Sequence, residues 1–86
     1  MRLDKYLKAS RLIKRRTIAS EACGNGRIVV NGRTAKASYE VKPGDIIELC
    51  FGQRTLKVEA LNVSEHATKL DAAAMYREVT VPVAHV

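Results

Sequence analysis

The stretch KRRTIASEACGNGRIVVNGR, Lys14 to Arg33, changes from a helical pattern to a strand pattern. Its first part predicts a helix, and the apolar stripe of that helix consists of Ile18, Ala19, Ala22 and Cys23. Gly24-Asn25-Gly26 ends the helix, because Gly and Asn adopt the left-handed conformation at low cost. Ile28 to Val30 then reads as a strand, and Asn31-Gly32 is the commonest sequence of a two-residue hairpin turn.

The pattern on either side extends this unit. Upstream, the apolar spacing of Leu3, Tyr6 and Leu7 predicts a helix from about Leu3 to Ala9. Downstream, the expected elements are a short strand over residues 33–37, a turn at Pro43-Gly44, and strands over residues 46–51 and 55–63. Buried and exposed positions alternate in the last strand until Leu61 and Val63, which predict a bulge or the end of the strand.

The C-terminal segment predicts a third helix. Thr68 and Asp71 have the spacing of a capping box, and an Ala-rich run follows, so the helix is expected over about Lys69 to Arg77. Residues 79–86 have no identifiable partner and are expected to form a loose tail. The whole pattern predicts an α+β chain in which residues 1–63 form the main domain and residues 64–86 form a C-terminal helix and tail.

The positive charge is concentrated at the N-terminus. Residues 1–16 contain seven Lys and Arg and one Asp, so this segment accounts for the whole net charge of +6. A clustered basic surface attracts polyanions and releases their counterions, which favours nucleic acid as the partner. A membrane is not expected, because Trp is absent, no long apolar run exists, and the N-terminus lacks the apolar region of a signal peptide. We therefore expect a cytoplasmic protein.

Catalytic and metal-binding patterns are weak. The nine acidic residues are dispersed, and the two His residues have no Ser or Cys partner at a known catalytic spacing. The segment GNGRIVVNG leads from helix to strand, whereas phosphate-binding loops lead from strand to helix. Cys23 and Cys50 form no CxxC pair and are expected to be small apolar residues. We expect no catalytic residue, no metal and no cofactor.

Lys14, Arg15 and Arg16 stand where the second helix begins. Cations are unfavourable there by roughly 0.3 to 1 kcal/mol each, because the helix dipole is positive at that end. A solvated charged face is one interpretation of the run. Its position at the helix start instead favours phosphate binding, since exposed N–H groups and the side chains can share one anion. Arg16 is the strongest candidate, because Arg binds phosphate bidentately and stacks on bases.

Four other residues are candidates for RNA contact, and each of them also has a purely structural interpretation. Asp4 is either a first-turn acid favoured by the dipole or an acceptor that orients Arg2 or Arg16. Asn31 is expected to serve the turn, with RNA contact following from its position. Tyr6 is expected in the core, and Tyr39 stays open between core and base stacking. Because aromatic residues are few, most contacts should be to phosphates and to the shape of folded RNA.

The segments RLDKYLKAS, KRRTIASEACGNGRIVVNGR and YEVKPGDIIEL together resemble the RNA-binding module of small-subunit ribosomal protein S4. The resemblance covers Met1 to about Leu49 and implies a two-helix αL motif. The short chain and the segment DAAAMYRE (residues 71–78) make it similar to small ribosome-associated quality-control proteins related to the fifteen-kilodalton heat-shock protein. This likeness implies a non-catalytic factor that binds rRNA and peptidyl-tRNA on a stalled large ribosomal subunit.

The same resemblance implies partners and site residues. The partners are the large subunit and RqcH, which adds a C-terminal alanine tail, and the free protein is expected to be a monomer. Its RNA-facing positions correspond to Arg2, Asp4, Lys14, Arg15, Arg16, Arg27, Asn31 and Lys36, and Arg11 joins them because it lies near a helix end. The family often has Ser or Thr where this chain has Arg15, so a hydroxyl cap is missing.

Two other functions are consistent with a basic module of this kind. One is an RNA-binding accessory domain of an RNA-modifying or tRNA-charging enzyme. The other is a DNA-binding or nucleoid protein.

Overall fold

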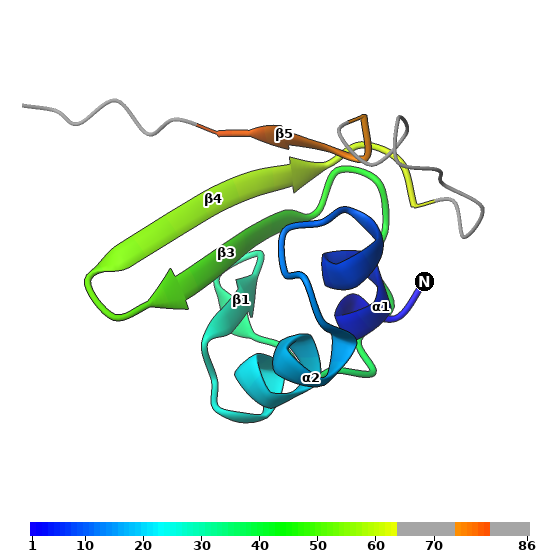
Figure 1. Ribbon diagram of the computed structural model, residues 1–86. Coiled ribbons are helices and arrows are strands. Elements are labelled where there is room, and N and C mark those ends of the chain that lie inside the picture. The colour runs from blue at the N-terminus through cyan, green and yellow to red at the C-terminus, as the bar shows by residue number, and fades with distance from the viewer. Residues whose placement is uncertain (64–73, 80–86) are drawn as a thin grey trace, which may run out of the picture.

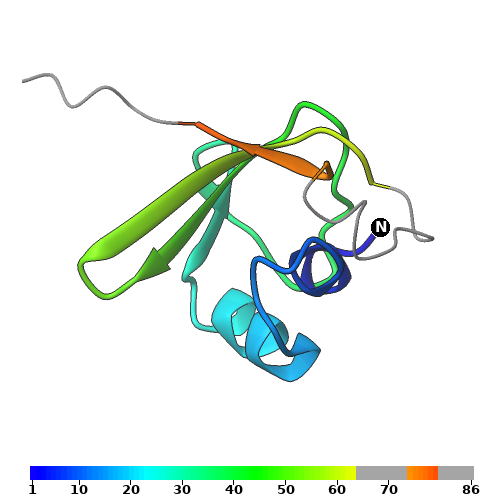
Figure 2. The same cartoon turned by 45° about the horizontal axis from the view of Figure 1, so that its top comes forward.

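The computed structural model describes residues 1–63 and 74–79, in which two short helices pack on one side of an antiparallel sheet (Figures 1 and 2). The elements in chain order are α1 (Leu3–Ala9), α2 (Arg16–Gly24), β1 (Ile28–Val30), β2 (Arg33–Thr34), β3 (Ile46–Phe51), β4 (Arg54–Ala60) and β5 (Tyr76–Glu78). The strand order is β2-β1-β3-β4-β5, and every neighbouring pair is antiparallel. The α+β class expected from the sequence is confirmed.

The two helices and the first hairpin follow local signals. Helix α1 has the predicted bounds, and α2 ends at Gly24 as the Gly-Asn-Gly segment indicates. Asn31 and Gly32 adopt φ values of 52° and 86°, which a two-residue hairpin turn of this twist requires at both central positions. Strand β2 is shorter than the predicted 33–37. Among the described residues, no helix is long and apolar enough to cross a membrane.

Strands β3 and β4 form the longest hairpin of the sheet. Their turn at Gly52-Gln53 pairs Phe51 with Arg54, and the hairpin extends beyond the helices in both views (Figures 1 and 2). Strand β4 ends at Ala60, so the break in alternation at Leu61 marks the end of a strand. This hairpin places Arg54 far along the sheet from the start of α1.

The core lies between the helices and the covered face of the sheet. Alternate strand residues face it, because successive side chains in a strand point to opposite faces. The core residues that are less than a tenth exposed are Leu3, Tyr6, Leu7, Ile13, Ala19, Ala22, Cys23, Ile28, Val30, Val41, Ile47, Leu49, Val58, Ala60 and Met75, and the polar residues Asp4 and Ser10 are buried as well. Tyr6 is completely buried, and its hydroxyl donates to the Met75 carbonyl at 2.6 Å. The expectation that Tyr6 belongs to the core is confirmed.

Ile18 does not belong to this core, and the predicted stripe of α2 is wrong at that position. Its side chain is 46% exposed, whereas Ala19, Ala22 and Cys23 are buried. The physical reason is geometric. Successive helical residues are rotated by about 100°, so Ile18 lies roughly a quarter turn away from the centre of the face formed by the other three. Helix α1 and the sheet cover only that face.

The prediction of a helix in the C-terminal segment is also wrong at two residues. Tyr76 and Arg77, expected at the end of a helix, lie in β5 and pair with β4, with Tyr76 opposite Ala60. Helix propensity is a weak preference, and pairing with a preformed strand edge outweighs it here. Residues 69–73 of the expected helix and residues 80–86 of the expected tail lie outside the described residues. Val79, at the start of that tail, donates its N–H to the Lys57 carbonyl. The domain boundary at residue 63 stays a prediction, although β5, which follows that residue in the chain, forms an edge strand of the sheet.

The two cysteines are expected to differ in reactivity. Cys23 is buried in α2, and burial, reinforced by the negative charge of Asp4, raises the pKa of its thiol to about 11. Cys50 lies in β3 and is only partly buried. Since the thiolate is the reactive form, we expect iodoacetamide to modify Cys50 first in the folded protein at pH 8. Mass spectrometry of peptides after brief labelling measures this, and equal labelling at early times would contradict it.

Candidate nucleic-acid interface

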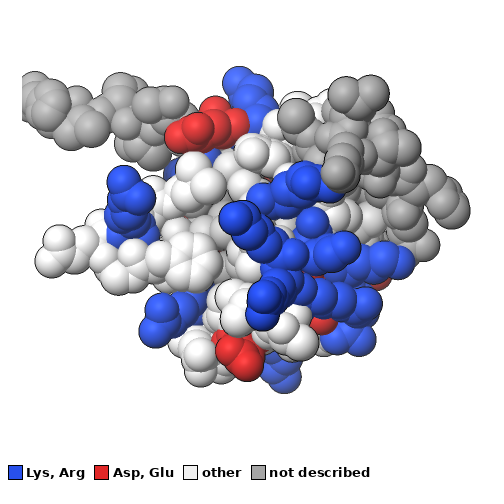
Figure 3. Space-filling view, in the orientation of Figure 1, with Lys and Arg blue, Asp and Glu red and all other residues white. Residues whose placement is uncertain are grey.

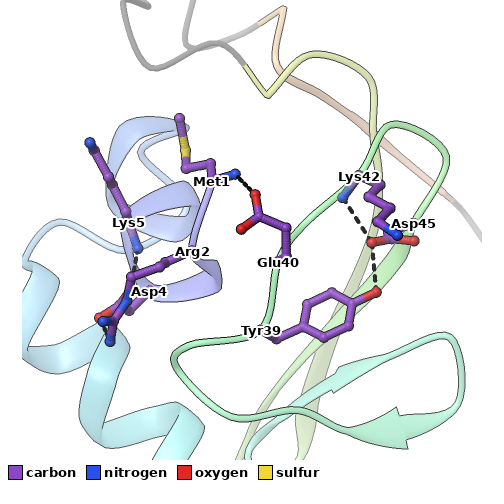
Figure 4. Close-up of polar contacts among 8 residues, drawn as sticks. All are labelled: Met1, Arg2, Asp4, Lys5, Tyr39, Glu40, Lys42 and Asp45. Carbon is purple, nitrogen blue, oxygen red and sulfur yellow. Dashed lines mark hydrogen bonds and ion pairs between the residues drawn. The ribbon is translucent and has the colours of Figure 1, made fainter.

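A buried carboxylate joins the starts of the two helices. The Asp4 side chain is only 5% exposed and accepts from Arg2 Nε at 3.2 Å and from the Lys5 backbone N–H at 2.8 Å. Its second oxygen lies 3.5 Å from Arg16 Nε, on the first residue of α2. Figure 4 shows Arg2 lying across Asp4 at the start of α1. Asp4 thus accepts hydrogen bonds from Arg2 and forms an ion pair with Arg16, in line with its interpretation as a residue that orients these side chains, and we call these three residues the Asp4 cluster.

The Asp4 cluster presents two guanidinium groups to solvent. The side chains of Arg2 and Arg16 are 52% and 50% exposed, although each is held on the buried Asp4. A guanidinium has five N–H donors, so each retains donors for another acceptor. Holding the side chains in advance reduces the conformational entropy that is lost when an anion binds. The arrangement suits phosphate oxygens.

The start of α1 is capped by a segment that is distant in sequence. Arg2 at the N-cap position makes no side-chain cap, and the N–H groups of Leu3 and Asp4 donate to the carbonyls of Tyr39 and Ala37. Met1 adds to this junction, because its amino group contacts the Glu40 carboxylate (Figure 4). The loop before β3 therefore fixes the position of the Asp4 cluster.

The start of α2 has no such cap. Arg15 at its N-cap position has extended backbone and no side-chain cap, as expected from the missing hydroxyl, and the first turn contains no acid. The Ala19 N–H is the first to bond within the helix, which leaves the N–H groups of Arg16, Thr17 and Ile18 without intrahelical acceptors. Lys14 and Arg15 are exposed and make no ion pair within the part of the chain that the structure describes. An anion at this end would be attracted by all of these groups.

Arg11 occupies a left-handed position between the helices, with φ of 65°. Its N–H donates to the Lys8 carbonyl, which is how helices commonly end, although Gly is the usual residue there. A non-Gly residue at such a position costs about 1 kcal/mol. Arg11 therefore has an unfavourable backbone conformation, and its side chain is exposed.

The remaining predicted residues are less closely grouped. Arg27 lies beyond the far end of α2, which separates it from Arg16 by about 13 Å of helix rise. Lys36 is exposed in the loop that caps α1. The Asn31 side chain bonds within the protein, accepting from the Ile46 N–H at 2.9 Å and donating to Asp45 at 3.0 Å, which agrees with a role in the turn. Figure 3 shows Lys and Arg side chains gathered over the α1–α2 side of this face.

A second polar group, centred on Asp45, was not predicted from the sequence. Its carboxylate accepts from Asn31 Nδ2, the Tyr39 hydroxyl and the Lys42 N–H at 2.9 to 3.0 Å. Figure 4 shows the contacts with Tyr39 and Lys42. Burial alone would raise the pKa of Asp45, but these hydrogen bonds outweigh it and lower the pKa below its ordinary value. The same bond raises the pKa of Tyr39. The Asp after Pro-Gly was the available signal, because Asp commonly bonds to nearby backbone in turns.

The fold agrees with comparison to known families. A family model described as the S4 domain matches residues 1–47. The solved trimeric structure of Vibrio cholerae heat shock protein 15 superimposes with a TM-score of 0.82 at 32% identity, covering 92% of this chain and 81% of that one. The chain belongs to the S4 domain family.

Comparison with individual relatives narrows the part of the S4 domain family to which the chain is similar. Proteins named RQC P-site tRNA stabilizing factor are 55% identical in Halalkalibacterium halodurans and 53% identical in Bacillus subtilis, each over 88% of this chain. The matches cover 86% and 88% of those relatives. Within the S4 domain family, the chain is therefore similar to the RqcP proteins, which are related to heat shock protein 15.

Proposed function

We propose that this protein is a non-catalytic, cytoplasmic RNA-binding factor of the large ribosomal subunit that acts in the rescue of stalled ribosomes. It contacts rRNA and peptidyl-tRNA together and supports alanine tailing by RqcH. The observation that carries the proposal is the Asp4 cluster, in which a buried carboxylate holds Arg2 and Arg16, at the starts of two helices, on one exposed surface.

The chemistry of this surface supports RNA rather than a small anion. The cluster is flanked by Lys14 and Arg15 at an uncapped helix start, and the N-terminal segment holds the whole net charge of +6. Several adjacent cations match a chain of phosphates better than a single one. The relatives' name refers to tRNA in the P site and to ribosome quality control, which supports tRNA on an obstructed subunit as the target.

Replacing Arg16 with Ala is expected to weaken co-sedimentation with large subunits carrying peptidyl-tRNA by about tenfold, because one charge-assisted contact is lost. The slope of log affinity against log salt should also fall by about one unit. Arg54→Ala is the matched control. It removes the same charge from an exposed Arg at the far end of the β3–β4 hairpin and should leave binding within about twofold.

Two results would contradict this proposal. Equal losses for both variants would mean that binding follows net charge alone and that no RNA-facing surface exists at the helix starts. Equal binding of the wild-type protein to empty and to peptidyl-tRNA-carrying subunits would remove tRNA from the target.

A further inference from the structure

An open hollow of about 500 Å³ lies between the β1–β2 hairpin and the loop that follows it. Its walls include Asn31 and Arg33 of the hairpin, and Lys36, Ser38 and Tyr39 of the loop. This volume is within the usual range for sites that bind small organic molecules. The hollow is separate from the Asp4 cluster, but the two are connected, because the carbonyls of Ala37 and Tyr39 cap the start of α1.

The side chains around the hollow combine two kinds of recognition. Arg33 and Lys36 are exposed cations, and the partly buried Tyr39 supplies an aromatic ring. Cations bind phosphate oxygens, and a tyrosine ring offers a flat apolar surface on which a base can stack. Thr34 and Ser38 add hydroxyl groups that can donate to or accept from a ribose or a base edge.

The two walls are held at a fixed separation by Asp45. Its carboxylate accepts from Asn31 on one wall at 3.0 Å and from the Tyr39 hydroxyl on the other at 2.9 Å. Asp45 opposes an anion electrostatically, but its oxygens are already occupied by these bonds and by the Lys42 N–H. The hydrogen bond from the Tyr39 hydroxyl to Asp45 therefore fixes the orientation of the Tyr39 ring before a ligand binds.

We propose that this hollow binds one unstacked ribonucleotide of the RNA that occupies the Asp4 cluster. The base stacks on Tyr39, and the phosphate lies between Arg33 and Lys36. This inference rests on the proposed function for the source of the nucleotide, although the site itself is defined by the hollow alone. It adds Arg33 and Tyr39 to the residues that contact RNA.

Amide NMR spectra of the ¹⁵N-labelled protein, titrated separately with adenosine 5′-monophosphate, adenosine and inorganic phosphate, test the site. We expect saturable shifts at Thr34, Lys36 and Ser38, with an affinity for the monophosphate about tenfold above that for phosphate, because base stacking adds to charge. Arg33→Ala should lower the monophosphate affinity about fivefold. The matched hairpin variant Arg54→Ala should change it less than twofold. Tyr39→Leu keeps an apolar side chain and should abolish the preference for monophosphate over phosphate.

The outcomes separate this site from the proposed function. Equal affinities for phosphate and monophosphate, or shifts confined to residues 14–16, would overturn the nucleotide site, and the spectra themselves report whether each variant is folded. If the monophosphate binds as expected while co-sedimentation with large subunits fails, the site stands and the ribosomal function falls. If co-sedimentation depends on Arg16 but the hollow shows no shifts, the site alone falls.

Discussion

Replacing Asp4 with Asn is expected to weaken binding to peptidyl-tRNA-carrying large subunits about 30-fold, although it makes the chain more positive by one charge. The carboxylate holds both Arg2 and Arg16, so one substitution releases two guanidinium groups from their bound orientation. Asn retains the size of the side chain and an acceptor for the Lys5 N–H, which preserves the start of α1. Co-sedimentation at fixed salt measures the loss.

The sign of this effect separates two explanations. If the surface acts only through its net charge, Asp4→Asn binds more tightly. If the orientation of the arginines matters, it binds more weakly. Glu21→Gln is the matched control, because it removes one negative charge from an exposed position on α2 and leaves the Asp4 cluster intact. We expect this control to bind as well as the wild-type protein or slightly more tightly, and tighter binding of Asp4→Asn would refute the role of the cluster.

Replacing Ile47 with Ala is expected to lower the free energy of unfolding by about 2 to 5 kcal/mol. Ile47 is completely buried in β3, between Val30 of β1 and Val58 of β4, so truncation leaves a cavity at the centre of the sheet. Domains of this size are stable by only about 5 to 15 kcal/mol, so the change removes a large part of the total. Urea denaturation followed by circular dichroism measures it.

Ile18→Ala provides the comparison for Ile47. The chemical change is identical, but the Ile18 side chain is 46% exposed on α2. Its loss should therefore change the free energy of unfolding by no more than about 0.5 kcal/mol. Comparable losses for the two variants would mean that Ile18 is buried in solution and that a different face of α2 packs on the core.

The structure agrees closely with the sequence-based prediction wherever a feature depends only on residues that are near one another in the chain. Helix α1 has its predicted ends, because Leu3, Tyr6 and Leu7 form one apolar face at helical spacing. The Asn31-Gly32 turn follows from the low cost of positive φ at those residues. The missing side-chain cap before Arg16 was likewise evident, since it depends only on which residue precedes the helix.

Features that depend on contacts between residues distant in the chain were not predicted. The expected helix ended in residues that instead form β5, because only the folded sheet supplies the β4 edge with which Tyr76 pairs. Ile18 is apolar and was predicted in the stripe of α2, yet which face of α2 is covered depends on where α1 and the sheet lie. The link between Asp45 and two walls of the hollow joins residues up to fourteen positions apart. No local pattern encodes it.

The α+β class, the concentration of charge at the N-terminus and the position of the cations at a helix start all follow from local patterns in the amino-acid sequence. The orientation of those cations depends on the tertiary structure. It brought the first residue of α2 beside a buried carboxylate of α1, and it placed the carbonyls of Ala37 and Tyr39 over the start of α1. Periodicity and turn chemistry act between neighbours in the chain, whereas the orientation of Arg2 and Arg16 requires the packing of two helices and a loop.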